Sequence, residues 1–258
     1  LLPTISLPVE TSTGNTNATS VSVSHSVARA IGLLPATAQP TDTAARIGFN
    51  SATNFDFDRN NGISSVLIDF EAVAIHEIGH ALGFTSRSGA STSTPAMWDL
   101  YRFRSGVTNA TFTSAARVMK IGGPVANSQV YFTPNASELG LSDGGPSGST
   151  DDNADGNQSS HWRQQSKDGG VLIGIMDPRI PSGTRRDIMP NDLVAMGIFG
   201  YNSAATSSPP PPNDNFSAGQ TIAGCSGTVA GTNVGATRER GEPNHEPGGN
   251  GGQHSVWY

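Results

Sequence analysis

Residues 69–84 read DFEAVAIHEIGHALGF, and this stretch predicts the central element of the fold. Phe70, Val73 and Ala81 recur at the spacing of one helix face, so we expect an amphipathic helix that packs against a core. Gly83 follows the last of these periodic positions, where a left-handed residue ends many helices and glycine meets no steric penalty. The chain is therefore expected to turn away sharply after this helix.

The predicted helix contains the pattern H-E-x-x-H at residues 76–80. His76 and His80 lie one turn apart on the same face, so both imidazoles can reach one metal ion. Glu77 can approach water at that metal without being a ligand, as general-base catalysis requires. The alternative is a core helix with two satisfied histidines. The two interpretations are compatible, because a metal-site helix must also pack.

The composition indicates a loop-rich protein of the secreted type. Charged residues make up only 14% of the 258 residues, whereas the chain contains 31 glycines and 17 prolines. This length allows one substantial core, or one core and a small module. The net charge of −6, without a run of Lys or Arg, argues against a nucleic-acid partner, and no apolar stretch is long enough to span a bilayer. A single cysteine, Cys225, excludes a disulfide within the chain.

Composition also divides the chain into parts. Residues 206–213 contain a run of prolines and predict a semi-rigid linker between a domain at 1–205 and a module at 214–258. The module is glycine-rich with short alternating runs, which indicates the opening strands of a truncated β-sandwich. In a non-enzymatic interpretation, this module would bind carbohydrate or a cell surface. Within the domain, the pattern predicts strands at residues 1–9, 19–23 and 46–49, helices at 26–34 and 190–199, and a long loop at 134–160.

A third metal ligand must come from outside the central helix, because a catalytic zinc site usually has three protein ligands. His161 is the candidate, in the run Asp155-Gly-Asn-Gln-Ser-Ser-His161-Trp162. Downstream of it lies Gly-Ile-Met176-Asp-Pro. The other histidines lie beside an expected N-terminal strand or beyond the linker: His25, His245 and His254.

These motifs together resemble the leishmanolysin-like branch of the metzincins, including bacterial secreted metalloproteases of that type. Most metzincins place the third histidine at the position of Ser86, whereas this branch places it far downstream. The resemblance covers roughly residues 45–203. It implies an α+β, metzincin-like zincin fold with a mixed N-terminal sheet, a central H-E-x-x-H helix and a loop-rich C-terminal subdomain that ends in a helix.

The same resemblance implies the activity and the site of a secreted zinc endopeptidase. Its zinc ligands would be His76, His80 and His161, and Glu77 would be the general base. Met176 would lie beneath the metal in a methionine-containing turn.

Other interpretations remain open. A non-catalytic adhesion or cell-surface binding protein, stabilised by zinc, would keep the histidines but would have no use for Glu77. A thermolysin-type site would take its third ligand from Glu138, the only glutamate between the motif and the linker. The turn Asp56–Gly62 resembles a calcium loop loosely, and a solvated turn is the simpler interpretation. The loop at 179–187 could favour acidic substrate side chains or be solvated, and its arginines are Arg179, Arg185 and Arg186.

Overall fold

The computed structural model describes residues 6–35, 37, 45–89, 94–122, 130–134, 138–149, 154–201, 211–213, 217 and 219. Within them the chain is of the α+β class, with few helices and small sheets. The helices are α1 (His25–Ala30), α2 (Phe70–Leu82) and α3 (Pro190–Ile198), with 3-10 turns η1 (Arg59–Asn61), η2 (Trp98–Tyr101) and η4 (Gln165–Lys167). Most of the expected linker and almost all of the expected module at 214–258 lie outside the described residues.

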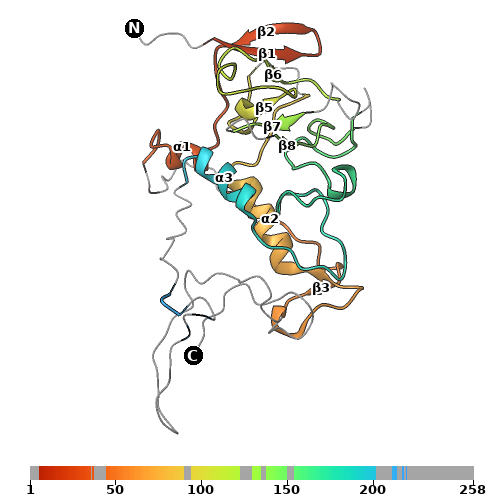
Figure 1. Cartoon of the computed structure of the whole chain (residues 1–258). Helices are drawn as coiled ribbons and strands as arrows, with labels where there is room; N and C mark the ends of the chain where they lie inside the picture. The colour runs from red at the N-terminus through yellow and green to blue at the C-terminus, as the bar shows by residue number, and fades with distance from the viewer. Residues whose placement is uncertain are drawn as a thin grey trace.

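The strands form three small sheets, two of which lie together on one side of the helices, while β3 of the third lies at the opposite end of α2 (Figure 1). The first has the order β2-β1-β6, in which β1 pairs antiparallel with β2 and parallel with β6, so the sheet near the N-terminus is mixed as expected. The second, β5-β7-β8, is antiparallel, and the third is the parallel pair β3-β4. The strands are β1 (Leu7–Thr11), β2 (Gly14–Ala18), β3 (Phe55–Asp56), β4 (Ile68–Asp69), β5 (Arg102–Phe103), β6 (Arg117–Val118), β7 (Tyr131–Phe132) and β8 (Leu139–Gly140).

Several local predictions were wrong. Residues 19–23 and 46–49 form no strand; the partner of β1 is β2, and the alternating segment at 19–23 makes only an isolated bridge from Ser22 to Ala96. The first helix ends at Ala30 and not at residue 34, because Gly32 adopts a positive φ of 76° just beyond the cap. The expected loop at 134–160 contains β8.

The core contains a cluster of packed aromatic rings, most of them in tilted or edge-to-face contact. Trp98 lies with its ring centroid 4.8 Å from that of Phe132 and 4.9 Å from that of Trp162, and all three side chains are fully buried. Phe84 follows α2, and its ring centroid lies 5.1 Å from that of Phe199 at the end of α3. Burial of each such side chain contributes about 1.5–3 kcal/mol. This cluster therefore fixes the segments on either side of the central helix.

The central helix forms as predicted, and its end is fixed by packing. Gly83 is its C-cap with φ 137°, and a Cβ there would lie 2.7 Å from Val27 and 3.0 Å from Phe199. Glycine is thus required both for the turn and for the close approach of α1 and α3. The expected final helix is also present as α3, with Pro190 in its first turn. None of the helices in the described part of the chain is long and apolar enough to cross a membrane.

Candidate metal centre

Three histidines meet at the middle of the molecule. His76 and His80 project from α2, and the Nε2 atom of His161 lies 3.1 Å from that of His76 and 3.2 Å from that of His80. His161 comes from a segment 81 positions after His80. The structure therefore brings together the three residues that the sequence nominated as ligands.

Each imidazole is oriented by a backbone carbonyl. The Nδ1 of His76 lies 2.9 Å from the carbonyl oxygen of Ile175. The Nδ1 of His80 lies 2.7 Å from that of Phe84, and the Nδ1 of His161 lies 3.0 Å from that of Gln158. A carbonyl oxygen can only accept, so Nδ1 carries the hydrogen in each ring. In the neutral ring Nε2 then carries a lone pair. The Nε2 atom of His161 thus lies about 3 Å from that of each of the other two rings, and the ligand atoms of all three lie within 4.8 Å of one another.

Such an arrangement suits a metal ion. Burial lowers the pKa of His76, and burial together with the neighbouring rings of His80 and His76 lowers the pKa of His161 to about 3, so these rings are neutral at pH 7. Tetrahedral zinc with Zn–N bonds of about 2.0–2.1 Å separates two nitrogen ligands by roughly 3.3–3.4 Å. The observed separations of 3.1 and 3.2 Å fit that value closely. The carbonyl partners are those that metal-binding histidines normally have.

The segment that carries His161 is docked beside the end of α2. The backbone N–H of Ser86 donates to the Oγ of Ser160 at 2.9 Å. Ser86 itself donates to Asp99 at 2.6 Å and lies outside the histidine cluster. The position at which most metzincins carry their third ligand is thus the docking point for the segment that supplies His161.

Met176 lies directly against α2. It is fully buried, and a Cβ added to Gly79 of the H-E-x-x-H motif would lie 2.5 Å from its Sδ. Ile175, the residue before it, is the one whose carbonyl orients His76. The methionine-containing turn therefore supports the centre by packing and through its backbone.

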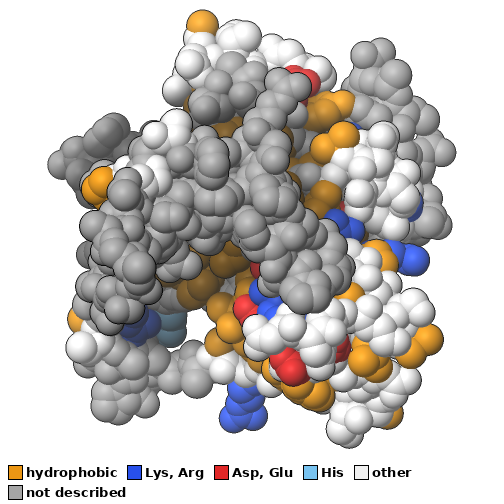
Figure 2. All heavy atoms as spheres, turned by 60° about the horizontal axis from the view of Figure 1, so that its bottom comes forward, with side chains coloured by type: hydrophobic (Ala, Val, Ile, Leu, Met, Phe, Trp, Pro, Cys, Tyr) orange, Lys and Arg blue, Asp and Glu red, His pale blue; other side chains and the backbone are white. Residues whose placement is uncertain are grey.

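Glu77 lies beside a pocket of about 270 Å³. Among the described residues, none donates a hydrogen bond to its carboxylate, so this group is available to accept a proton. The pocket walls are mainly apolar and include Phe55, Val73, Pro178 and Ile180. The end of the molecule that carries β3 exposes hydrophobic side chains among acidic and basic groups (Figure 2).

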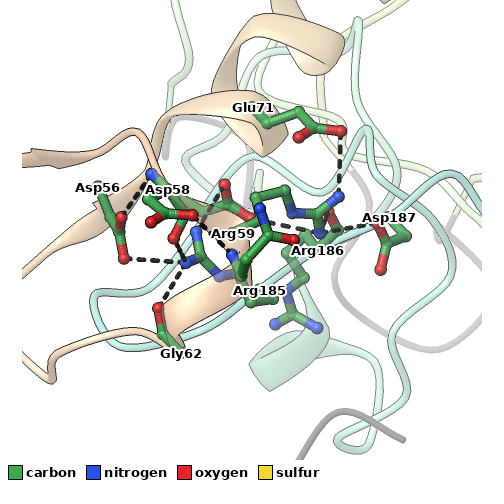
Figure 3. Close-up of polar contacts among 10 residues, drawn as sticks. Asp56, Asp58, Arg59, Gly62, Glu71, Arg185, Arg186 and Asp187 are labelled. Atoms are coloured by element: carbon green, nitrogen blue, oxygen red, sulfur yellow. Dashed lines mark hydrogen bonds and ion pairs between the residues drawn. The ribbon is translucent and has the colours of Figure 1, made fainter. Parts of the chain in front are cut away.

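The two walls of this pocket are joined by an arginine network, shown in Figure 3. Arg185, from the loop after Met176, donates through Nη2 to the Asp56 carboxylate at 2.9 Å and to the carbonyl oxygens of Asp58 at 2.7 Å and Gly62 at 2.6 Å. Its Nη1 lies 3.2 Å from Asp69, the fully buried N-cap residue of α2. Most of the turn is exposed, as a solvated turn should be. Arg185, in contrast, is not solvated, because these oxygens surround a side chain that is only 5% exposed.

A second arginine reinforces the same junction. Arg59 lies 3.1 Å from Glu71, 2.8 Å from Asp187 and 3.6 Å from Asp69. We call Arg59 and Arg185 the arginine clasp. The clasp holds the loop at 179–187 against the segment that precedes α2.

Sequence reasoning missed Asp192, a buried carboxylate of α3 that contacts Trp162 and the backbone of Ile175. The only signal was an acidic residue in a first helical turn, which carries no information about those contacts. Glu138, the thermolysin-type candidate, accepts from Ser105 and Gly106 and is not part of the histidine cluster. Comparisons of the chain with known protein families, with curated proteins and with solved structures found no match.

Proposed function

We propose that this protein is a secreted, zinc-dependent endopeptidase of metzincin type. The observation that carries the proposal is the convergence of three oriented Nε2 lone pairs with a half-buried glutamate at the mouth of an apolar pocket. A purely structural metal site has no need for the glutamate or for the pocket. Together they favour hydrolysis over adhesion.

The residues have distinct roles in this proposal. His76, His80 and His161 hold the metal, and their Nδ1 hydrogen bonds keep the rings in one tautomer. When bound, zinc supplies a Lewis acid that polarises a carbonyl and makes water more acidic. Glu77 accepts the proton of the attacking water and then delivers it to the nitrogen of the leaving amine.

The pocket supports a polypeptide substrate with an apolar side chain next to the cleaved bond. Val73 and Glu77 lie one turn apart on α2, and both line the pocket, so a side chain seated there brings its peptide group close to the general base. Ile68 and Ile180 add apolar surface from the two walls. We therefore expect faster cleavage of peptides with Leu or Phe than with Asp or Lys at this position.

Casein hydrolysis by the wild type and a Glu77→Gln variant tests the proposal. General-base catalysis typically contributes 10²–10⁴-fold, so the variant should lose about that factor in kcat/KM while it retains one zinc per chain. Glu71→Gln is the matched control, because Glu71 lies on the same helix but is exposed and bound to Arg59. Full activity in Glu77→Gln would remove the proposed mechanism.

The same preparation distinguishes the adhesion alternative. If neither casein nor a peptide library is cleaved, but a chelator lowers the melting temperature, the metal is structural. If the chelator abolishes cleavage and added zinc restores it, the metal is catalytic.

A further inference from the structure

We propose that Asp192 is a positioning residue of the metal centre, which fixes two of the three histidine ligands from a distance. Its side chain is 2% exposed, on the first turn of α3. It touches none of the three rings; its hydrogen bonds go to the groups that hold them. The inference rests on the metal-binding part of the proposed function and does not depend on peptide hydrolysis.

The first connection runs to His76. Asp192 Oδ2 accepts from the backbone N–H of Ile175 at 2.8 Å, and the carbonyl of that same residue accepts from Nδ1 of His76 at 2.9 Å. Asp192 thus holds the backbone N–H of Ile175, and the carbonyl of Ile175 sets the orientation of the His76 ring. A shift of Ile175 would turn the His76 lone pair away from the common point.

The second connection runs to His161. Asp192 Oδ1 accepts from the indole Nε1 of Trp162 at 2.7 Å, and the backbone N–H of Trp162 donates to the carbonyl of Met176 at 3.0 Å. Trp162 directly follows His161, so the position of Trp162 determines where the backbone of His161 lies. The indole is fully buried, which leaves it no alternative partner from solvent.

The Asp192 carboxylate fits against Trp162 because residue 174 is a glycine. A Cβ at Gly174 would lie 2.5 Å from the indole nitrogen of Trp162 and would collide with the Asp192 carboxylate. A further donor is the N–H of Met189 at the N-cap of α3, at 2.8 Å from Oδ2. One carboxylate therefore ties the helix, the methionine-containing turn and the His161 segment together.

An Asp192→Asn variant tests this role, because asparagine keeps the volume but cannot accept all three hydrogens. In either orientation its amide NH₂ faces at least one N–H donor. Loss of groups that orient metal ligands typically weakens metal affinity about 10–100-fold, and we expect a loss in that range by calorimetric zinc titration. With saturating Co²⁺ in place of zinc, the visible absorption spectrum of the variant should shift, since the ligand geometry changes.

Asn191→Ala is the matched control. Asn191 donates to the carbonyl of Ile173 at 2.8 Å from the same helical turn, but that contact leads to no ligand. The control should lower the melting temperature while its zinc affinity stays within twofold of the wild type. An Asp192→Asn variant that is destabilised like the control but binds zinc as tightly as the wild type would overturn the inference.

Trp162→Phe decides the question if Asp192→Asn does not fold. It removes the indole N–H together with part of the ring but keeps an aromatic side chain in the core, so the inference predicts weaker zinc binding and a Co²⁺ spectrum shifted from that of the wild type. Unchanged affinity in Trp162→Phe overturns the inference. Absence of any zinc binding by the wild-type protein would instead remove the proposed function.

Discussion

Replacement of the buried Arg185 by Met should strongly destabilise the protein. The Nη1 of Arg185 forms an ion pair with Asp69 Oδ1 at 3.2 Å, the only ion pair within 3.5 Å of that carboxylate among the described residues. Its Nη2 supplies three hydrogen bonds to the turn Asp56–Gly62. Both carboxylates are buried, Asp69 completely and Asp56 to 7% exposure. Methionine fills a similar volume but supplies no charge and no donor.

The size of the loss in unfolding free energy follows from the contacts that Asp69 and Asp56 keep in the variant. Among the residues that the structure describes, Asp69 would retain only Arg59, at 3.6 Å, and Asp56 would retain only the N–H of Asp58, at 2.9 Å. Removal of one partner of a buried ion pair typically costs 3–5 kcal/mol, because an uncompensated buried charge remains. We expect a loss of about 3–5 kcal/mol in the free energy of unfolding. An Arg185→Met, Asp69→Asn double variant should recover part of it, since one of the two orphaned charges is then absent.

Urea denaturation at pH 7, with saturating zinc, measures this loss. Arg179→Met is the matched control in the same loop, because Arg179 is exposed, and it should change stability by less than about 0.5 kcal/mol. The clasp also holds one wall of the pocket, so KM for a peptide substrate should rise in Arg185→Met while the zinc content stays at one per chain. A destabilisation below about 1 kcal/mol would refute the reasoning that these carboxylates depend on Arg185.

Three further predictions concern other parts of the molecule. Substitution of His161 by Ala should abolish tight zinc binding in a calorimetric titration, whereas His25→Ala should not; an unchanged affinity would remove His161 from the ligand set. Gly79→Ala should destabilise the protein by about 1–2 kcal/mol in urea, because overpacking against the Sδ of Met176 outweighs a gain in helix propensity of up to about 1 kcal/mol. Burial beside Asp155 raises the pKa of Asp143 from 3.8 to about 6, so the folded state keeps a proton that the unfolded chain releases, and this contribution to stability is lost as the pH rises from about 4 to 6. An Asp143→Asn variant should therefore gain about 2 kcal/mol over the wild type at pH 7.5 relative to pH 4, and equal pH dependence in both proteins would contradict this.

The parts of the site that the sequence could predict are local. His76, Glu77 and His80 share one helix, so their mutual placement follows from helix periodicity alone. The end of that helix at Gly83 was predictable for the same reason. His161 was nominated because a metal site needs a third ligand, and the structure places its Nε2 beside the other two.

The parts that could not be predicted depend on partners far along the chain. Arg185 meets Asp56 across 129 positions, and Asp192 meets Trp162 across 30, and no pattern near either residue encodes those contacts. The failed strand at 46–49 has a similar cause, because a β-strand is stabilised by its neighbour and alternation alone does not supply one. The metzincin fold and the peptidase activity stay predictions.

The distance in sequence between the histidine ligands has a consequence for protein synthesis. A chain that has emerged from the ribosome only as far as α2 carries His76, Glu77 and His80, but it cannot close the centre until His161 and then Asp192 have followed. At translation rates of about 5–20 residues per second, that interval lasts on the order of ten seconds. The nascent chain therefore passes through its early folding without a complete histidine cluster. Under the proposed function, it would have no hydrolytic centre during that interval.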